Sequence, residues 1–123
     1  HTTRNTSDNV FKAMEQSGIR GNLCRCFADI EYHPDLREDS SVILEELGRL
    51  YADWHGKEEE RLTLSVGPLN PWGCSPELFI KSASFAKDHG LKFQIHTAET
   101  KSVVDRTIAK YGKRNVEFFA VKR

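Results

Sequence analysis

The protein has 123 residues, which is enough for one small domain with a single core. Its 18 basic and 18 acidic residues cancel, and no basic run is longer than two residues, which argues against nucleic acid as a partner. No apolar stretch approaches the roughly 20 residues of a membrane helix, so no membrane partner is expected either. Three cysteines without zinc-finger spacing, and no visible signal peptide, predict a reduced, cytoplasmic setting.

The predicted elements alternate between helices and strands. A helix is expected where apolar residues recur every three or four positions between a capping residue and a glycine, most clearly between Ser75 and Gly90. In chain order we predict a helix over 6–18, a strand over 19–30, a loop over 31–40, a helix over 40–56, a solvated loop over 57–61, a strand over 61–68, a loop over 70–74, a helix over 75–90, a strand over 91–96, a helix over 100–112 and the start of another from 114. Helical crossovers between strands favour a parallel sheet of the α/β class, with the three strands adjacent.

Two of the predicted strands have one apolar and one polar face, because side chains alternate along a strand. The apolar faces are Leu62, Leu64 and Val66 in one strand and Leu91, Phe93 and Ile95 in the other; the polar faces are Thr63, Ser65 and Gly67, and Lys92, Gln94 and His96. An ordinary doubly wound sheet buries both faces and is apolar on both. We therefore expect the apolar faces to meet helices and the polar faces to line a barrel interior. His96 would then lie at the carboxyl end of its strand, where barrels place their active sites.

His96 has two interpretations. It is either an ordinary strand-end histidine or a metal ligand that acts together with Glu99, three residues further on. A neutral imidazole is a good zinc ligand, and a carboxylate beside a metal-activated water can move protons. The His-x-x-Glu spacing alone does not decide between them.

Several longer segments bear on this choice. They are VFKAMEQSGIR, SVGPLNPWGCSPELF and AKDHGLKFQIHTAET, which together span most of the chain in order. This combination resembles the amidohydrolase superfamily, in its metal-dependent deaminase and chlorohydrolase branch of methylthioadenosine/S-adenosylhomocysteine deaminases, guanine deaminase and triazine hydrolases. The resemblance implies a partial (β/α)₈ barrel, about the third to fifth βα units. Residues 1–123, which do not start with Met, would then be one barrel domain truncated at both ends.

The resemblance also implies an activity for the full-length protein. That activity is hydrolytic deamination, or dechlorination, of a small nitrogen heterocycle by a metal-activated hydroxide. By resemblance His96 binds the divalent metal, Zn²⁺ or alternatively Fe²⁺, and Glu99 is the catalytic proton shuttle. The family's other metal ligands, a His-x-His pair and a further histidine and aspartate, are not recognised in this sequence. We therefore expect the isolated chain to be inactive. The full-length protein is expected to be a homo-oligomer.

Three further residues are candidates for binding the substrate: Asn70, Trp72 and Arg25. Asn70 could offer its amide to a ring nitrogen, and Trp72 could stack on a heterocycle. Leu69 stands where adenosine-type members of the branch often have a histidine, which makes purine nucleosides a less favoured substrate. Arg25 either holds the substrate or forms an ion pair within the barrel or at its rim.

Some residues and functions keep rival interpretations. Cys24 and Cys26 are interpreted as small buried thiols, with a metal pair as the alternative. Three of the remaining histidines are expected to be solvated or to cap helices: His33, His55 and His89. His1 is too close to the start of the chain to assign. The rivals to a metal-dependent hydrolase are a non-catalytic α/β binding module and a metal-independent barrel enzyme.

Overall fold

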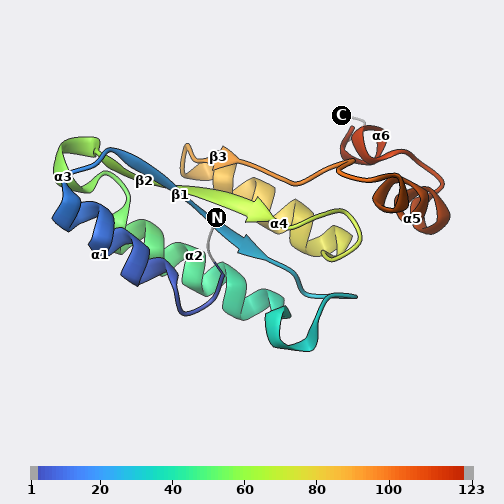
Figure 1. The fold of residues 1–123 in the computed structure, drawn as a ribbon, viewed down its shortest axis with the longest axis horizontal. Helices are drawn as coiled ribbons and strands as arrows, with labels where there is room; N and C mark the ends of the chain where they lie inside the picture. Colours follow the sequence, from blue (N-terminus) through green and yellow to red (C-terminus); the bar gives the residue numbers. More distant parts are fainter. Residues whose placement is uncertain (1–2, 121–123) are drawn as a thin grey trace.

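The computed structural model describes residues 3–120, and its centre is a three-stranded parallel sheet (Figure 1). The strands are β1 (Gly21–Phe27), β2 (Leu62–Pro68) and β3 (Lys92–Phe93), in the order β1-β2-β3. The helices are α1 (Ser7–Ser17), α2 (Ser40–Trp54), α3 (Lys57–Glu60), α4 (Pro76–Asp88), α5 (Lys101–Tyr111) and α6 (Asn115–Phe119), with a 3-10 helix η1 (Pro34–Leu36). Both strand pairs are parallel, so the predicted arrangement of adjacent parallel strands is confirmed.

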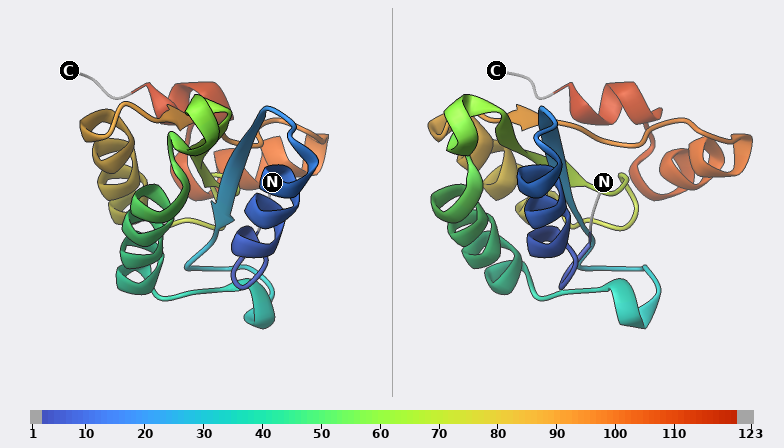
Figure 2. Two further views of the ribbon diagram at one scale, coloured as in Figure 1. Left: turned by 90° about the vertical axis from the view of Figure 1, so that its left-hand side faces the viewer. Right: turned by 60° about the vertical axis from the view of Figure 1, so that its left-hand side comes forward.

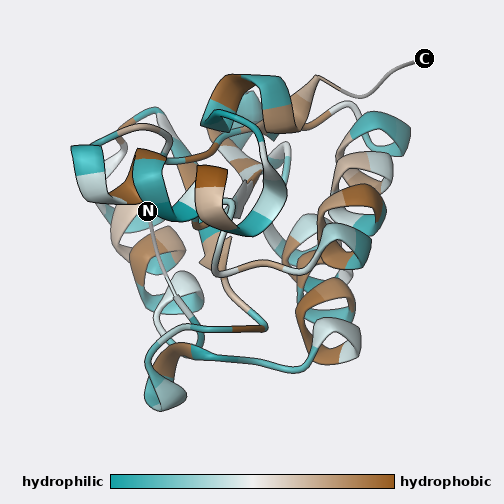
Figure 3. Ribbon diagram, turned by 90° about the vertical axis from the view of Figure 1, so that its right-hand side faces the viewer, coloured by the Kyte–Doolittle hydropathy of each residue, from teal (hydrophilic) through white to brown (hydrophobic). Residues whose placement is uncertain are grey.

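The core lies between the sheet and the helices α1, α2 and α4, which run alongside it (Figure 2). It consists of two apolar clusters, and the helices carry hydrophobic and hydrophilic stripes (Figure 3). The larger buried members of the clusters are Phe11, Leu23, Leu50, Trp54, Leu62 and Leu64, and Phe27, Ile43, Leu47, Val66 and Leu78. The apolar face predicted for β2 is therefore the face that meets the helices. Helices α5 and α6 lie instead beyond the carboxyl ends of the strands (Figure 1).

The sequence spacing predicts a buried stripe on α2 made of Val42, Leu44, Leu47, Leu50, Tyr51 and Trp54, and the observed stripe is rotated slightly from it. Val42 is 38% exposed, whereas its neighbour Ile43 is completely buried. Placing Val42 in the stripe was wrong, because the helix turns the face that starts at Ile43 toward the sheet. Trp54 does lie in the core: its ring stacks on Phe11 at 5.2 Å, and its Nε1 donates to Asp8 at 2.8 Å.

Strand β3 is much shorter than the predicted strand over 91–96. Within residues 3–120 it pairs with β2 alone, and beyond Phe93 the ladder is continued by Gln94, whose backbone N–H donates to the carbonyl of Val66 at 2.9 Å. Leu91 and Ile95 pack against the core as expected, but Phe93 is 38% exposed, because no helix among residues 3–120 buries it. His96 therefore lies in an irregular segment just past the strand.

The ends of most helices follow the predicted signals. The hydroxyl of Ser75 accepts from the N–H of Leu78 and begins α4, and Gly18 adopts the left-handed conformation that ends α1. The segment predicted as a solvated loop over 57–61 is exposed for most of its length but forms the short, left-handed α3. Helix α6 begins at Asn115, one residue after the predicted start; residues 121–123 of that prediction lie outside the described residues. No helix within 3–120 is long and apolar enough to cross a membrane.

Arg25 is a buried cation on the helix-facing side of β1. Its Nη2 lies 2.6 Å from a carboxylate oxygen of Glu38 and 2.5 Å from one of Glu46, and its Nη1 donates to the carbonyl of Cys26. Burial alone would lower the pKa of Arg25, but its bonds to the two carboxylates outweigh burial and raise that pKa. The structure thus shows the ion-pair alternative and places this side chain between sheet and helix.

Loss of this cation is expected to destabilise the protein. Arg25→Met would leave the buried carboxylate of Glu38 and the partly buried one of Glu46 without their partner, at a cost on the order of 3 kcal/mol in the free energy of unfolding. The matched control is Arg49→Met, because Arg49 pairs with Asp8 at the surface, where such pairs contribute about 0–1 kcal/mol. Urea unfolding of the full-length variants measures both. Equal losses in the two variants would contradict a structural role for the buried pair.

Candidate active site at the carboxyl ends of the strands

A cavity of about 470 Å³ lies where the carboxyl ends of the strands meet α5. It is lined by residues from the loop before α1, the ends of the strands and α5: Thr3, Thr6, Cys26, Tyr32, Leu69, Asn70, Trp72, His96, Glu99 and Val103. Four of the five site residues predicted from the sequence are among them. Arg25 does not line the cavity, so its predicted contact with substrate is corrected: it is held by its carboxylate partners on the opposite face of β1.

The loop after β2, residues 69–75, is fastened to the end of β1. Oδ1 of Asn70 accepts from the N–H of Gly73 at 2.7 Å, and a Cβ on Gly73 would lie only 2.9 Å from that oxygen. The carbonyl of Gly73 accepts from two backbone N–H groups that follow β1, and Asp29 accepts from both the N–H and the hydroxyl of Ser75. This bonding gives the wall that carries Trp72 a defined shape.

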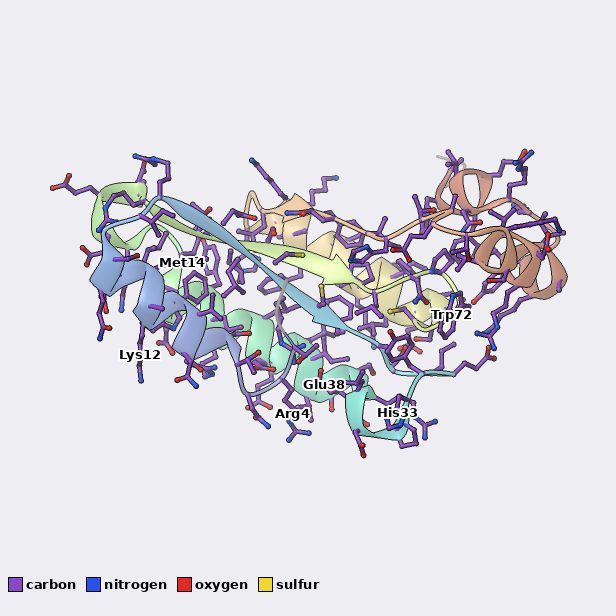
Figure 4. The ribbon with its side chains drawn as sticks, viewed as in Figure 1. Arg4, Lys12, Met14, His33, Glu38 and Trp72 are labelled. Atoms are coloured by element: carbon purple, nitrogen blue, oxygen red, sulfur yellow. The ribbon has the colours of Figure 1, made fainter. Side chains whose placement is uncertain are left out.

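The indole ring of Trp72 has two contacts that hold it in place. Tyr32 stacks on it with ring centroids 5.3 Å apart, and the guanidinium of Arg106 lies 4.5 Å from the ring centroid. In Figure 4 Trp72 lies past the end of β2, on the side of α5. Its Nε1 is buried without a hydrogen-bond partner among residues 3–120. Tyr32 and Trp72 together form an aromatic wall of the cavity.

Helix α5 closes another side and is tied to the loops of the other elements. The hydroxyl of Tyr111 donates to the carbonyl of Pro71 at 3.1 Å, and Nζ of Lys110 donates to Glu31 at 2.8 Å. Partial burial, the largest single effect, would lower the pKa of Lys110, but Glu31 and Tyr111 together outweigh it, so the pKa of Lys110 is raised. These contacts position α5, and with it Val103, at the cavity.

His96 and Glu99 face each other across a turn. Nδ1 of His96 lies 3.6 Å from Oε1 of Glu99, which is within ion-pair range but longer than a hydrogen bond. Ala98 between them has φ of 53°, a left-handed conformation that costs a non-glycine residue roughly 1–3 kcal/mol. This turn brings two side chains three residues apart into one cavity without a helix. Both are partly exposed, by 41% and 59% respectively, and so accessible to a ligand.

Potential metal ligands at the cavity are few among residues 3–120. Among residues 3–120, no group of three or more histidines, cysteines or carboxylates could hold a metal ion. His96 supplies one imidazole, the donor type that zinc prefers, and a catalytic zinc requires about three protein ligands. His33, His55 and His89 are engaged elsewhere, with Asp35, the N–H of Leu64 and the carbonyl of Phe85 respectively. His1 lies outside the described residues.

It follows that the isolated 123-residue chain should bind zinc weakly. One recognised ligand gives neither the geometry nor the charge of a complete site, so we expect no stoichiometric tight binding. Isothermal titration calorimetry of the isolated chain measures this, with the full-length protein as the control. Tight binding of one equivalent by the isolated chain would show that its residues complete a site by themselves.

Several lining residues are absent from the sequence-based prediction. Tyr32 follows β1 in the polar loop, and the rule that loops after parallel strands build the site would have pointed to it. Val103 and Thr6 belong to a helix and a helix cap by pattern, and no sequence signal distinguishes them from ordinary residues of those elements. Cys26 was interpreted as a buried thiol, with a metal pair as the alternative, and not as a residue that lines the substrate cavity.

Comparison with known proteins places this site in a family. A model of the amidohydrolase family matches residues 1–121. The chain belongs to the amidohydrolase family. The predicted membership of the superfamily is therefore confirmed.

Individual relatives of this amidohydrolase-family chain include nucleoside deaminases. It is 36% identical over 110 residues to a 5-methylthioadenosine/S-adenosylhomocysteine deaminase of Caldanaerobacter subterraneus subsp. tengcongensis, covering 89% of this chain and 24% of the relative. It is 36% identical over 111 residues to a 5'-deoxyadenosine deaminase of Methanopyrus kandleri, covering 90% and 25%. The chain thus spans about a quarter of the length of these relatives.

The fold is shared with solved structures. An atrazine chlorohydrolase from Arthrobacter aurescens TC1, complexed with zinc, superposes with a TM-score of 0.84 at 22% identity, covering 94% of this chain and 27% of that one. At this identity the likeness concerns the fold alone. It agrees with the α/β arrangement of parallel strands and helices seen here.

Proposed function

We propose that this chain forms one side of the active site of a metal-dependent hydrolase that deaminates, or dechlorinates, a nitrogen heterocycle. The observation that carries the proposal is the His96–Glu99 pair at a cavity with an aromatic wall. The names of the relatives, deaminases of adenosine derivatives and a chlorohydrolase complexed with zinc, support it. The chain would correspond to about the third to fifth βα units of a (β/α)₈ barrel, and the polar face of its strands to part of the barrel interior.

His96 would hold the metal together with ligands from outside this chain. A neutral imidazole nitrogen of His96 would be the metal donor, and the carboxylate of Glu99, 3.6 Å from Nδ1, would lie beside it. Zn²⁺, or alternatively Fe²⁺, would lower the pKa of a bound water toward about 7. Glu99 would take the proton of the attacking water on its carboxylate and deliver it to the ring or the leaving group.

The rest of the cavity would hold the ring. Trp72 and Tyr32 offer apolar, planar surface, which suits a flat heterocycle. Asn70 already uses its carbonyl oxygen on Gly73, so its amide N–H₂ is the group it can offer to a ring nitrogen. Leu69 presents an apolar side chain to the same cavity.

A panel of amino- and chloro-substituted heterocycles tests the proposal with the full-length protein. We expect release of ammonia or chloride that stops on chelation and returns when zinc is added. Turnover that persists without metal would instead favour a metal-independent barrel enzyme. Binding of heterocycles without turnover of any would favour a non-catalytic binding module.

The aromatic wall makes a prediction about substrate affinity. Tyr32→Leu is expected to raise KM several-fold with little change in kcat, because an aromatic contact contributes about 0.5–1.5 kcal/mol beyond its buried area. Tyr32→Phe is the matched control, since it keeps the ring and loses only the hydroxyl. Steady-state kinetics of both variants provide the measurement. If Tyr32→Phe raised KM as much as Tyr32→Leu, the hydroxyl rather than the ring would be responsible.

A further inference from the structure

Cys24 and Cys26 lie on the face of β1 that points away from the helices. They are two residues apart in a regular strand, so their side chains share a face, opposite to that of Arg25. Both are buried and neither forms a disulfide. The proposed hydrolytic mechanism uses neither of them.

The two thiols converge on one point above Gly67 of β2. Cys26 is the register partner of Gly67, and both sulfur atoms lie within 3.3 Å of the position that a Cβ on residue 67 would occupy. Any other residue at this position would place its Cβ against the sulfurs. The absence of a Cβ at Gly67 therefore makes room for the two sulfur atoms, which lie close together.

The pair can be reached from the cavity. Cys26 lines the cavity of about 470 Å³ and also a neighbouring one of about 170 Å³. An ion that enters the larger cavity can thus reach the thiol of Cys26. His96 and Glu99 line the same larger cavity. Neither of them is among the nearest neighbours of Gly67, so the two sulfur atoms form a separate pair of donors.

The thiols are electronically unequal because they share a hydrogen bond. The hydrogen bond from Cys26 lowers the pKa of Cys24 to about 7, whereas the same bond, together with burial, raises the pKa of Cys26. The thiolate is the form of cysteine that binds metal ions.

Geometry distinguishes the chemistries open to such a pair. Residues two apart in an extended strand have Cα atoms about 6.6–7.2 Å apart, at or beyond the upper end of the roughly 4.4–6.8 Å of a disulfide. Structural zinc requires four ligands, and no third histidine, cysteine or carboxylate among residues 3–120 completes such a group. A pair that is too far apart for a disulfide and has too few ligands for zinc can still bind an ion that takes two soft sulfur ligands. Cu⁺ is such an ion.

We propose that Cys24 and Cys26 form a two-thiolate site for a soft monovalent metal ion of the Cu⁺ type, distinct from the site at His96. The ion forms one bond to each sulfur. The thiol proton of Cys26, and that of Cys24 where it is still protonated, passes to solvent. The metal keeps its +1 charge, so nothing is oxidised or reduced.

Competition with a coloured Cu⁺ chelator tests this in the full-length protein under reducing conditions. Wild type is expected to withdraw one more equivalent of Cu⁺ from the Cu⁺–bicinchoninate complex than Cys24→Ser and Cys26→Ser do. Cys74→Ser is the matched control, because Cys74 is also buried but its Sγ donates to the carbonyl of Phe27. Cys74→Ser should still bind the additional equivalent of Cu⁺. His96→Ala should bind it too, because this variant affects only the proposed hydrolase site.

Since serine in a buried position can disturb folding, a measurement on wild type accompanies the variants. Copper K-edge absorption of the one-equivalent Cu⁺ complex should show two sulfur neighbours and no shell of nitrogen or oxygen. Nitrogen or oxygen ligands, or an equivalent that Cys24→Ser and Cys26→Ser both retain, would overturn the proposal. No uptake of Cu⁺ by folded wild type would overturn it as well.

Discussion

In the full-length protein, Glu99→Gln is expected to lower kcat by roughly 10²–10⁴ while leaving most of the bound metal in place. The substitution keeps the size of the side chain but removes the group that takes up and releases a proton, and a positioned acid–base group contributes on this scale. The carboxylate of Glu99 lies 3.6 Å from His96 and is partly exposed to the cavity, so it is placed to transfer protons to a bound ligand. The measurement is kcat on a heterocycle that the wild type hydrolyses, beside metal content by atomic emission.

The control for Glu99→Gln is Glu77→Gln. Like Glu99, Glu77 is an exposed carboxylate with a nitrogen-containing partner, in its case Lys81 at 2.6 Å. It lies on α4, away from the cavity. Its substitution should leave kcat unchanged. Near-normal turnover of Glu99→Gln would remove Glu99 from the chemistry.

His96→Ala should lower both metal content and turnover. Loss of a direct ligand is expected to weaken metal binding by more than the roughly 10–100-fold that loss of an outer hydrogen-bond partner costs. Turnover should fall in parallel and recover in part with excess metal. Metal content after dialysis and kcat at rising zinc concentrations provide the two measurements.

His33→Ala is the matched control for His96→Ala. His33 also has a carboxylate at 3.6 Å, from Asp35, but its side chain is exposed and lies outside the cavity. It should keep full metal content and full turnover. If His96→Ala also kept its metal, His96 would be the ordinary histidine at the end of a strand that its sequence context equally allowed.

The two variants should fail in different ways, and this separates the two roles. Glu99→Gln is expected to retain metal without turnover, whereas His96→Ala is expected to lose both. A purely structural pair would lose thermal stability together with activity in both variants. Thermal unfolding curves of the two proteins therefore belong beside the kinetics.

Local patterns predicted the fold well where local chemistry determines it. The helix after Ser75 and the parallel order of the strands follow from capping residues and helical crossovers, and both are confirmed. The predicted length of β3 was wrong, because backbone pairing beyond Phe93 depends on neighbouring strands rather than on the alternation of side chains. Val42 was misplaced for a similar reason: the rotation of α2 is set by the sheet beneath it.

The candidate site was predictable only in part. His96 and Glu99 were proposed from a resemblance, but their approach depends on the left-handed backbone of Ala98, which composition and spacing do not reveal. Tyr32 reaches the cavity only because its loop folds back onto Trp72. Arg25 could not be assigned from the strand pattern, since its role depends on carboxylates 13 and 21 residues away.

The central claim is that His96 holds a catalytic metal at this cavity, and anomalous diffraction at the zinc edge from crystals of the zinc-loaded full-length protein tests it most directly. The account predicts an anomalous peak about 2.0–2.1 Å from an imidazole nitrogen of His96, the usual zinc–nitrogen bond length, with the carboxylate of Glu99 beside it. Protein ligands from outside residues 3–120 should complete the coordination. A fully occupied zinc elsewhere in the protein, with none bonded to His96, would contradict the account.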